Sequence, residues 1–166
     1  MTIGQPFSGN ALRAVDGEGR TRLPPFVLRV LERRGAGARL LLGAHPSGLC
    51  LSGYDEGHTA VLFAELERLQ LRDEAVGVAE TAHHARAHTM FGAVEEARFD
   101  AGGRFVLPAM MRRRGRIAGL ALYVGTGGSF EIWDPHLARE AGGDVLRELA
   151  EYLLHDAGHL EREDAG

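Results

Sequence analysis

The stretch "VDGEGRTRLP" at residues 15–24 has a second version, "FDAGGRFVLP", at residues 99–108. Adding 84 to a residue number in the first copy gives its counterpart in the second. Within residues 7–24, six identities share this register: Phe7 and Phe91, Asp16 and Asp100, Gly19 and Gly103, Arg20 and Arg104, Leu23 and Leu107, and Pro24 and Pro108. A repeat of this kind predicts a duplicated structural unit in which each copy contains the same tight turn.

Each copy has the same order of local signals around its turn. Short apolar segments flank the turn, which predicts two strands, and the proline after the second strand suits a helix start. A Gly-rich hairpin pattern closes each copy. The expected segments are strands at 10–15 and 20–23, a helix at 24–35 and a hairpin at 40–54, then strands at 95–99 and 104–107, a helix at 108–115 and a hairpin at 120–134.

Helical patterns connect and follow the two copies. Leu62, Leu66 and Leu69 have helical spacing within residues 59–71, and residues 73–92 are expected to form a second helix. Asp134 and Pro135 form an N-cap and first-turn pair. The next helix has apolar residues on one side: Val145, Leu149, Tyr152 and Leu153. The sequence therefore predicts an α+β protein with a first half at 7–54, a helical connector at 55–90, a second half at 91–134 and a C-terminal helical segment at 135–166.

The composition is that of a soluble globular protein, with 45% hydrophobic and 25% charged residues. No apolar run approaches the roughly 18–20 residues of a membrane span. The first ten residues lack the basic start and apolar stretch of a secretory signal. Cys50, the sole cysteine, has no partner for an internal disulfide. We therefore expect a cytoplasmic protein that does not associate with membranes.

The charge is distributed unevenly along the chain. The formal net charge is −4, but residues 131–166 hold ten acidic residues against three arginines, and the remainder carries a small positive excess. This acidic end is typical of a solvated helix, with an interaction tail as the alternative. All 19 basic residues are arginines, so any basic side chain that contacts an anion is planar and able to form two parallel hydrogen bonds.

The repeated turn permits two interpretations. An Asp at the start of a turn accepts hydrogen bonds from backbone N–H groups, and Gly19 and Gly103 permit a positive φ. In the structural interpretation, Asp and Arg pair with each other and only lock the turn. Because both copies keep Asp, Gly and Arg, we favour a surface that is presented twice. Phosphates and guanine edges are targets that suit a forked guanidinium group.

Other chemistry is weakly supported by the sequence. Asp16 and Asp100 could form a hydrolytic carboxylate pair, but neither is followed by the hydroxyl residue found in aspartic proteases. His84 and His88 have a spacing compatible with a metal, yet no further ligand is evident near them or near His83, so solvated or phosphate-facing histidines are favoured. Cys50 lies in an apolar strand, which indicates a core position. We expect no enzyme activity, catalytic residue, metal or cofactor.

The motifs together resemble the MraZ family of bacterial regulators. The resemblance extends from Phe7 to Trp133 and includes "FSG", both Asp-x-x-Gly-Arg turns with "LP" after them, "CLSGY", "MFG" and "VGTGGSFEIWD". It implies a tandem-duplicated double split β-barrel of the AbrB-like kind. It also implies a ring-shaped homo-oligomer that is associated with the nucleoid and regulates the division and cell-wall gene cluster by binding short G-rich repeats in promoter DNA.

The resemblance carries specific residues over to this chain. The motif positions are Asp16 and Arg20 in the first turn and Asp100 and Arg104 in the second, with the arginines contacting DNA and the aspartates supporting their turns. Further candidates for contacts to the DNA backbone are Arg13, Arg22, Arg98 and Arg112. Glu18 occupies a position that is often basic in the family, which predicts weaker attraction of phosphate to the first turn. The alternatives are an oligomeric interaction scaffold that does not bind DNA, and a carboxylate-dyad hydrolase.

Overall fold

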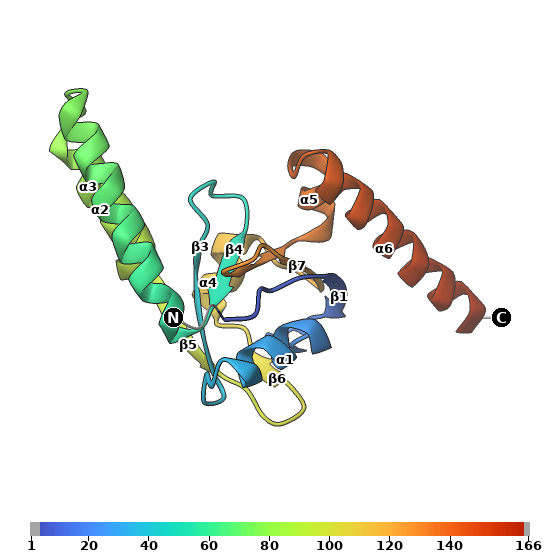
Figure 1. Ribbon diagram of the computed structural model, residues 1–166. Helices are drawn as coiled ribbons and strands as arrows, with labels where there is room; N and C mark the ends of the chain where they lie inside the picture. The colour runs from blue at the N-terminus through green and yellow to red at the C-terminus, as the bar shows by residue number, and fades with distance from the viewer. Residues whose placement is uncertain (1–3, 165–166) are drawn as a thin grey trace.

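A computed structural model of the chain describes residues 4–164, with side chains described as far as Gly158 (Figure 1). Within these residues the chain forms eight strands and six α-helices. The strands are β1 (Asn10–Ala14), β2 (Arg20–Arg22), β3 (Arg39–Ala44), β4 (Leu51–Tyr54), β5 (Val94–Arg98), β6 (Arg104–Val106), β7 (Leu120–Gly125) and β8 (Phe130–Trp133). The helices are α1 (Pro25–Arg33), α2 (Thr59–Ala75), α3 (Glu80–Ala87), α4 (Ala109–Gly115), α5 (Pro135–Ala141) and α6 (Asp144–Asp164), with a 3-10 turn η1 (Glu56–His58) and a π-helical turn η2 (His88–Gly92).

The two copies share one antiparallel sheet with the order β1-β7-β8-β4-β3-β5. Strand β1 of the first copy pairs with β7 of the second, and β5 of the second copy pairs with β3 of the first. At the centre β4 pairs with β8, while β2 and β6 form a separate two-stranded ribbon. The predicted α+β class is confirmed. The strand pairing leaves the six-stranded sheet open at β1 and β5, so a closed barrel is not observed.

The main core lies on the inner face of this sheet. Helices α1 and α4 cover that face with residues such as Val27, Leu31 and Met111, which are fully buried. At the seam between the copies Gly53 of β4 lies opposite Phe130 of β8. A Cβ at position 53 would come within 2.2 Å of the Phe130 ring, so the close approach of these strands requires glycine.

The outer face of the sheet is covered in part by α5 and α6, which project to one side (Figure 1). The predicted N-cap is confirmed, because Asp134 accepts hydrogen bonds from the backbone N–H groups of the next turn. The predicted apolar side of α6 is wrong in part: Val145 and Tyr152 are each 69% exposed. Helix α6 instead contacts this second core cluster through Leu146, Ala150 and Leu153. The apolar residues of α6 lie on more than one side of the helix. The packing of α6 beside α5 and the sheet determines which of these sides is buried.

The connector forms a projecting helical hairpin (Figure 1). Residues 73–92, predicted as one helix, are divided: α2 continues to Ala75, the chain reverses at Gly77 with a φ of 75°, and α3 begins at Glu80. Asp73 is buried in the hairpin and accepts a hydrogen bond from Arg86 at 3.0 Å. Among the described helices none is both long and apolar enough to cross a membrane.

Candidate nucleic-acid interface

The first repeated turn is closed by the side chain of Asp16. Its Oδ1 accepts hydrogen bonds from the backbone N–H groups of Glu18 at 2.9 Å and Arg20 at 2.8 Å. Its Oδ2 accepts a third from Nε of Arg20 at 2.8 Å. Gly19 adopts a φ of 88°, the left-handed region that a tight reversal needs. One carboxylate thus fixes both the backbone of the turn and the Nε end of the arginine's guanidinium group.

The second turn repeats this arrangement atom for atom. Oδ1 of Asp100 accepts from the backbone N–H groups of Gly102 at 3.0 Å and Arg104 at 2.9 Å. Oδ2 accepts from Nε of Arg104 at 2.8 Å, and Gly103 has a φ of 83°. The pairing of Asp with Arg that the structural interpretation expected therefore occurs in both copies. It uses Nε, so the two Nη atoms at the tip of each guanidinium group are left for other partners.

Backbone hydrogen bonds hold the two turns against each other. The N–H of Leu23 donates to the carbonyl of Gly103, and the N–H of Leu107 donates to the carbonyl of Gly19, each at 2.8 Å. Strand β2 pairs with β6 directly beside these bonds. A Cβ on Gly19 would lie 2.6 Å from the carbonyl oxygen of Leu107. The spacing between the two turns is therefore fixed by the backbone.

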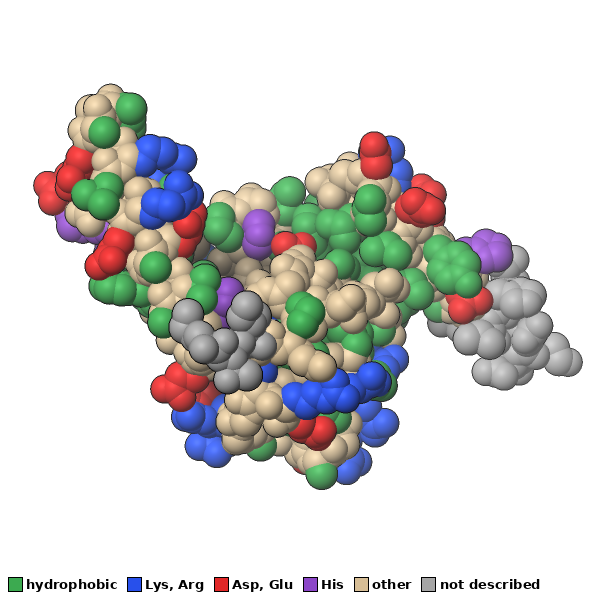
Figure 2. All heavy atoms as spheres, viewed as in Figure 1, with side chains coloured by type: hydrophobic (Ala, Val, Ile, Leu, Met, Phe, Trp, Pro, Cys, Tyr) green, Lys and Arg blue, Asp and Glu red, His purple; other side chains and the backbone are tan. Residues whose placement is uncertain are grey.

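Four arginines from both copies gather on one surface beside the turns. Arg20, Arg22 and Arg104 lie on the exposed face of the β2–β6 ribbon, and Arg13 of β1 joins them around a shallow open depression. Arg22 and Arg104 are directly opposite in the strand register. Figure 2 shows arginine side chains gathered at the lower end of the molecule as drawn, where Figure 1 places β6 and α1. Like charges placed opposite each other favour an anionic partner.

The other two predicted arginines do not line this depression. Arg98 is 77% exposed on β5 and is 3.8 Å from Glu96, on the strand that borders β3. Arg112 of α4 donates from Nη1 to the backbone carbonyls of Asp16 at 3.4 Å and Gly17 at 3.3 Å. An arginine of the second copy thus supports the turn of the first, a contact that the sequence does not predict.

The arginine tips of the two turns differ in their surroundings. Nη2 of Arg20 forms an ion pair with Glu18 at 3.0 Å. The matching position in the second turn is Gly102, and among the residues described Asp100 is the one acidic residue that forms an ion pair with Arg104. Arg20 and Arg104 are nonetheless similarly exposed, at 65% and 69%.

Comparison with known proteins shows that the chain is similar to members of one family of transcriptional regulators. The transcriptional regulator MraZ of Azorhizobium caulinodans is 34% identical over 150 residues, which cover 87% of this chain and 89% of that protein. The chain belongs to the MraZ family. The transcriptional regulator MraZ of Xanthomonas campestris pv. campestris is 30% identical over 156 residues, which cover 89% of this chain and 99% of that protein. The transcriptional regulator MraZ of Syntrophobacter fumaroxidans is 26% identical over 157 residues, which cover 91% of this chain and 97% of that protein. A comparison with protein-family models found no match.

The electrostatics of this MraZ-family site argue against a proton-sharing carboxylate pair. Hydrogen bonds from Arg20, from its side chain and then its backbone, lower the pKa of Asp16. The backbone N–H of Arg104, followed by its side chain, lowers the pKa of Asp100. A hydrolytic dyad requires one carboxyl group with a raised pKa. Here both are stabilised in the charged form, each by the arginine of its own turn.

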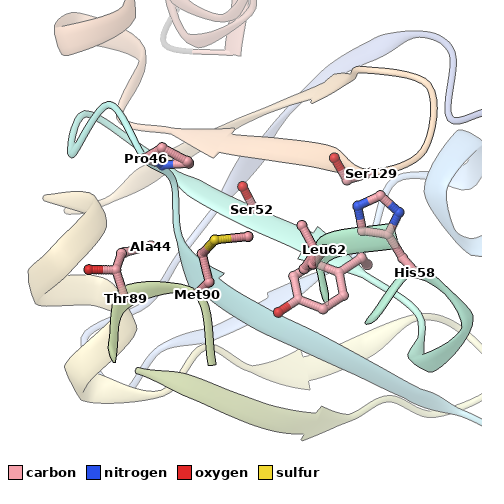
Figure 3. A pocket seen from close by; sticks show the side chains of 10 residues that line it. Ala44, Pro46, Ser52, His58, Leu62, Thr89, Met90 and Ser129 are labelled. Carbon is pink, nitrogen blue, oxygen red and sulfur yellow. The ribbon is translucent and has the colours of Figure 1, made fainter. Parts of the chain in front are cut away.

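A cavity between the connector and the outer face of the sheet is too small for a substrate. It has a volume of about 60 Å³, against roughly 300–1,000 Å³ for ligand pockets. Figure 3 shows His58, Leu62 and Met90 around it, with Ser52 on the sheet and Ser129 beside His58. Burial lowers the pKa of His58, which favours the neutral ring.

The structure also places the histidines and the cysteine considered in the sequence. His84 is 62% exposed and is 3.8 Å from Glu80 of its own helix. Cys50 is buried, as predicted. Within the described part of the chain, the one group of three side chains that could share a metal ion is His45, Cys50 and Glu131. The sequence did not indicate this group, because Glu131 comes from the other copy.

Proposed function

We propose that this protein is a DNA-binding transcriptional regulator in which Arg20 and Arg104 contact DNA. The observation that carries the proposal is the surface formed by Arg13, Arg20, Arg22 and Arg104, which draws on both copies and is anchored by two bonded turns. The family relationship to proteins named transcriptional regulators supports the same function.

The bonding of each turn suits recognition of guanine or phosphate. Because Nε is held by Asp16 or Asp100, each guanidinium group projects from a fixed point, and less side-chain entropy is lost on binding. The Nη atoms can then donate to O6 and N7 of guanine, or to two phosphate oxygens. Arg13, Arg22 and Arg98 supply backbone contacts in this proposal, while Arg112 supports the first turn.

A pair of small turns contacts few base pairs, so we propose that assembly supplies the remaining affinity. Short G-rich repeats in promoter DNA would be bound by several copies of the chain in a ring, where linkage raises the effective concentration of each turn. The exchange of strands between the copies supports a tandem unit related to the double split β-barrel. The proposal places the protein in the cytoplasm at the nucleoid, with the division and cell-wall gene cluster as its target.

The test is a gel-shift titration on the DNA upstream of the protein's own gene at several salt concentrations. The double variant Arg20→Ala/Arg104→Ala should lose about 100-fold or more in affinity, and its log–log salt slope should fall by about two. The matched control is Arg68→Ala/Arg147→Ala, which removes the same charge from α2 and α6. Equal losses of DNA affinity in both double variants would mean that net charge alone causes the effect. That result would overturn the assignment of Arg20 and Arg104 as DNA-contacting residues.

The same titration separates the alternatives. A scaffold that does not bind DNA would show no shift with wild-type protein at low salt, which would refute the proposed function. A hydrolase would lose turnover in Asp16→Asn while its DNA affinity stayed constant. Sedimentation of the wild-type chain tests the ring: a monomer at micromolar concentration in the presence of DNA repeats would contradict it.

A further inference from the structure

Three side chains with metal-binding atoms meet on the outer face of the central strands. His45 follows β3, Cys50 precedes β4, and Glu131 lies on β8. The Nε2, Sγ and carboxylate oxygen atoms all lie within 4.8 Å of one another. Nε2 of His45 is 3.3 Å from Oε2 of Glu131. The first two residues belong to one copy of the repeat and the third to the other, across the β4–β8 seam.

The remaining polar atoms of this cluster already have partners. Oε1 of Glu131 accepts a hydrogen bond from Nε1 of Trp133 at 2.8 Å, which leaves Oε2 facing His45. On the far side of the imidazole ring, Nδ1 of His45 lies 2.8 Å from Oγ of Ser47. Partners of this kind orient the ligands of protein metal sites. Cys50 is 1% exposed, whereas the His45 and Glu131 side chains are 33% and 16% exposed, so the cluster opens towards solvent on their side.

We propose that His45, Cys50 and Glu131 bind a transition-metal ion, with Zn²⁺ the best match. Thiolate, imidazole and carboxylate are ligand types that zinc uses, and three protein ligands leave a fourth position for water. In a tetrahedral site with bonds of about 2.0–2.1 Å, nitrogen and oxygen ligands are separated by roughly 3.3 Å. The separation of Nε2 and Oε2 is also 3.3 Å. Sγ of Cys50 lies within 4.8 Å of both atoms, so the thiol has to move only modestly to complete the site.

Binding exchanges protons in a defined way. Nε2 of His45 faces Glu131 and Nδ1 faces Ser47, so the metal would occupy Nε2. The imidazole then binds as the tautomer with its proton on Nδ1, which lies 2.8 Å from Oγ of Ser47 as an acceptor. The Cys50 thiol gives its proton to solvent as the S–metal bond forms. Burial, followed by the charge of Glu131, raises the pKa of this thiol, and a cation at the site compensates the repulsion between thiolate and carboxylate.

The ion would act as a cross-link between the two copies of the repeat. Because the unfolded chain does not hold the three ligands together, metal binding stabilises the folded state by mass action. At a free Zn²⁺ concentration of about 100 times Kd, the melting temperature should rise by about 5–10 °C. The site is separate from the arginine surface, so this test does not depend on DNA binding.

The decisive experiment is a Co²⁺ titration of the full chain after treatment with a chelator. Cys50 is the sole cysteine, so a thiolate-to-metal charge-transfer band can arise only from it. We expect this band to appear with tetrahedral visible absorption, to saturate at one ion per chain, and to be displaced by Zn²⁺. Absence of the band in wild-type protein would overturn the proposal without any variant.

Variants then identify the ligands. Cys50→Ser should abolish the band, and Glu131→Gln should weaken Zn²⁺ affinity at least about tenfold while the amide oxygen still accepts from Trp133. The matched control is His136→Gln, an exposed histidine on α5, which should bind as wild type does. Circular dichroism without metal checks that each variant folds. Unchanged Zn²⁺ affinity in folded Glu131→Gln would remove that residue from the site, and the proposed cross-link with it.

Discussion

The two turns at residues 15–20 and 99–104 have the same internal bonds but different surroundings. In both, one Asp fixes the backbone and holds Nε of an arginine at 2.8 Å. In the first turn, however, Glu18 also pairs with the arginine tip, and Arg112 donates to the backbone carbonyls. The second turn has glycine in place of Glu18. Its arginine pairs with Asp100 and therefore lacks the second ion pair that Glu18 forms with Arg20.

The two turns share their internal hydrogen bonds, whereas the residues that contact them from outside differ. The hydrogen bonds within the turn are local, so each copy retains them independently. The contacts at the tip and beneath the turn come from positions where the copies differ, such as Glu18 against Gly102 and Arg112 against Leu28. We infer that the first turn is the better anchored of the two, and that the second contributes more to binding.

The largest expected difference between the turns concerns their glycines. Gly19→Ala should lower the free energy of unfolding by about 2–4 kcal/mol, because alanine has a strained positive φ and its Cβ would lie 2.6 Å from a carbonyl oxygen. Gly103→Ala should cost about 1–2 kcal/mol, since its closest contact is 3.2 Å. Urea unfolding of both variants measures this, and equal losses would contradict the difference in packing.

The next effect concerns DNA affinity. Arg104→Ala should weaken binding to the upstream DNA by about 10–100-fold, within the range for a bidentate contact to guanine. Arg20→Ala should weaken it less, because part of that arginine's hydrogen-bonding capacity is already used by Glu18. Fluorescence anisotropy at one fixed salt concentration compares the two variants. A larger loss in Arg20→Ala would reverse the proposed order of the turns.

A smaller effect is expected on removing the acid of the first turn. Glu18→Gln should raise DNA affinity about two- to fivefold, because it frees the tip of Arg20 and removes one charge that repels phosphate. The control is Glu67→Gln, an exposed acid on α2 with the same charge change. The gain should shrink as salt increases. An equal gain in both variants would assign it to net charge alone.

The smallest effect concerns the titration of the two aspartates. Both have a pKa below the ordinary value of about 3.9, so their stabilising bonds are complete above that pH and are lost as the pH falls through the folded-state pKa. Arg20→Ala should raise the pKa of Asp16 more than Arg104→Ala raises that of Asp100. The largest cause is the Arg20 side chain in the first turn and the Arg104 backbone in the second. Carbon-detected NMR titration of the carboxyl groups tests this.

Much of the fold was predictable because its signals are local or repeated. The turns, the short strands around them, both hairpins and helix α1 with its Gly35 terminus follow from turn chemistry and apolar spacing. The break at Gly77 and the buried side of α6 were not predicted. In each case the outcome depends on a packing partner: α3 folds back on α2, and α6 docks beside α5 against the sheet.

The candidate sites divide in the same way. The pairing of Asp16 with Arg20 was foreseeable because both residues lie in one turn. The support that Arg112 gives to that turn joins residues 96 apart, and the His45, Cys50 and Glu131 cluster draws on both copies. Sequence spacing carries no information about such contacts, since strand exchange creates them.

The sequence by itself determined the family, the repeated motif and the two arginine-bearing turns, because identities in one register and the bonding rules of a tight turn need no distant partner. Only the tertiary structure decided how the copies combine. Pairing of β1 with β7, β3 with β5 and β2 with β6 brings both turns to one surface, and pairing of β4 with β8 brings Glu131 to Cys50. The physical reason is that backbone groups at strand edges must be hydrogen-bonded, and here their partners come from the other half of the chain.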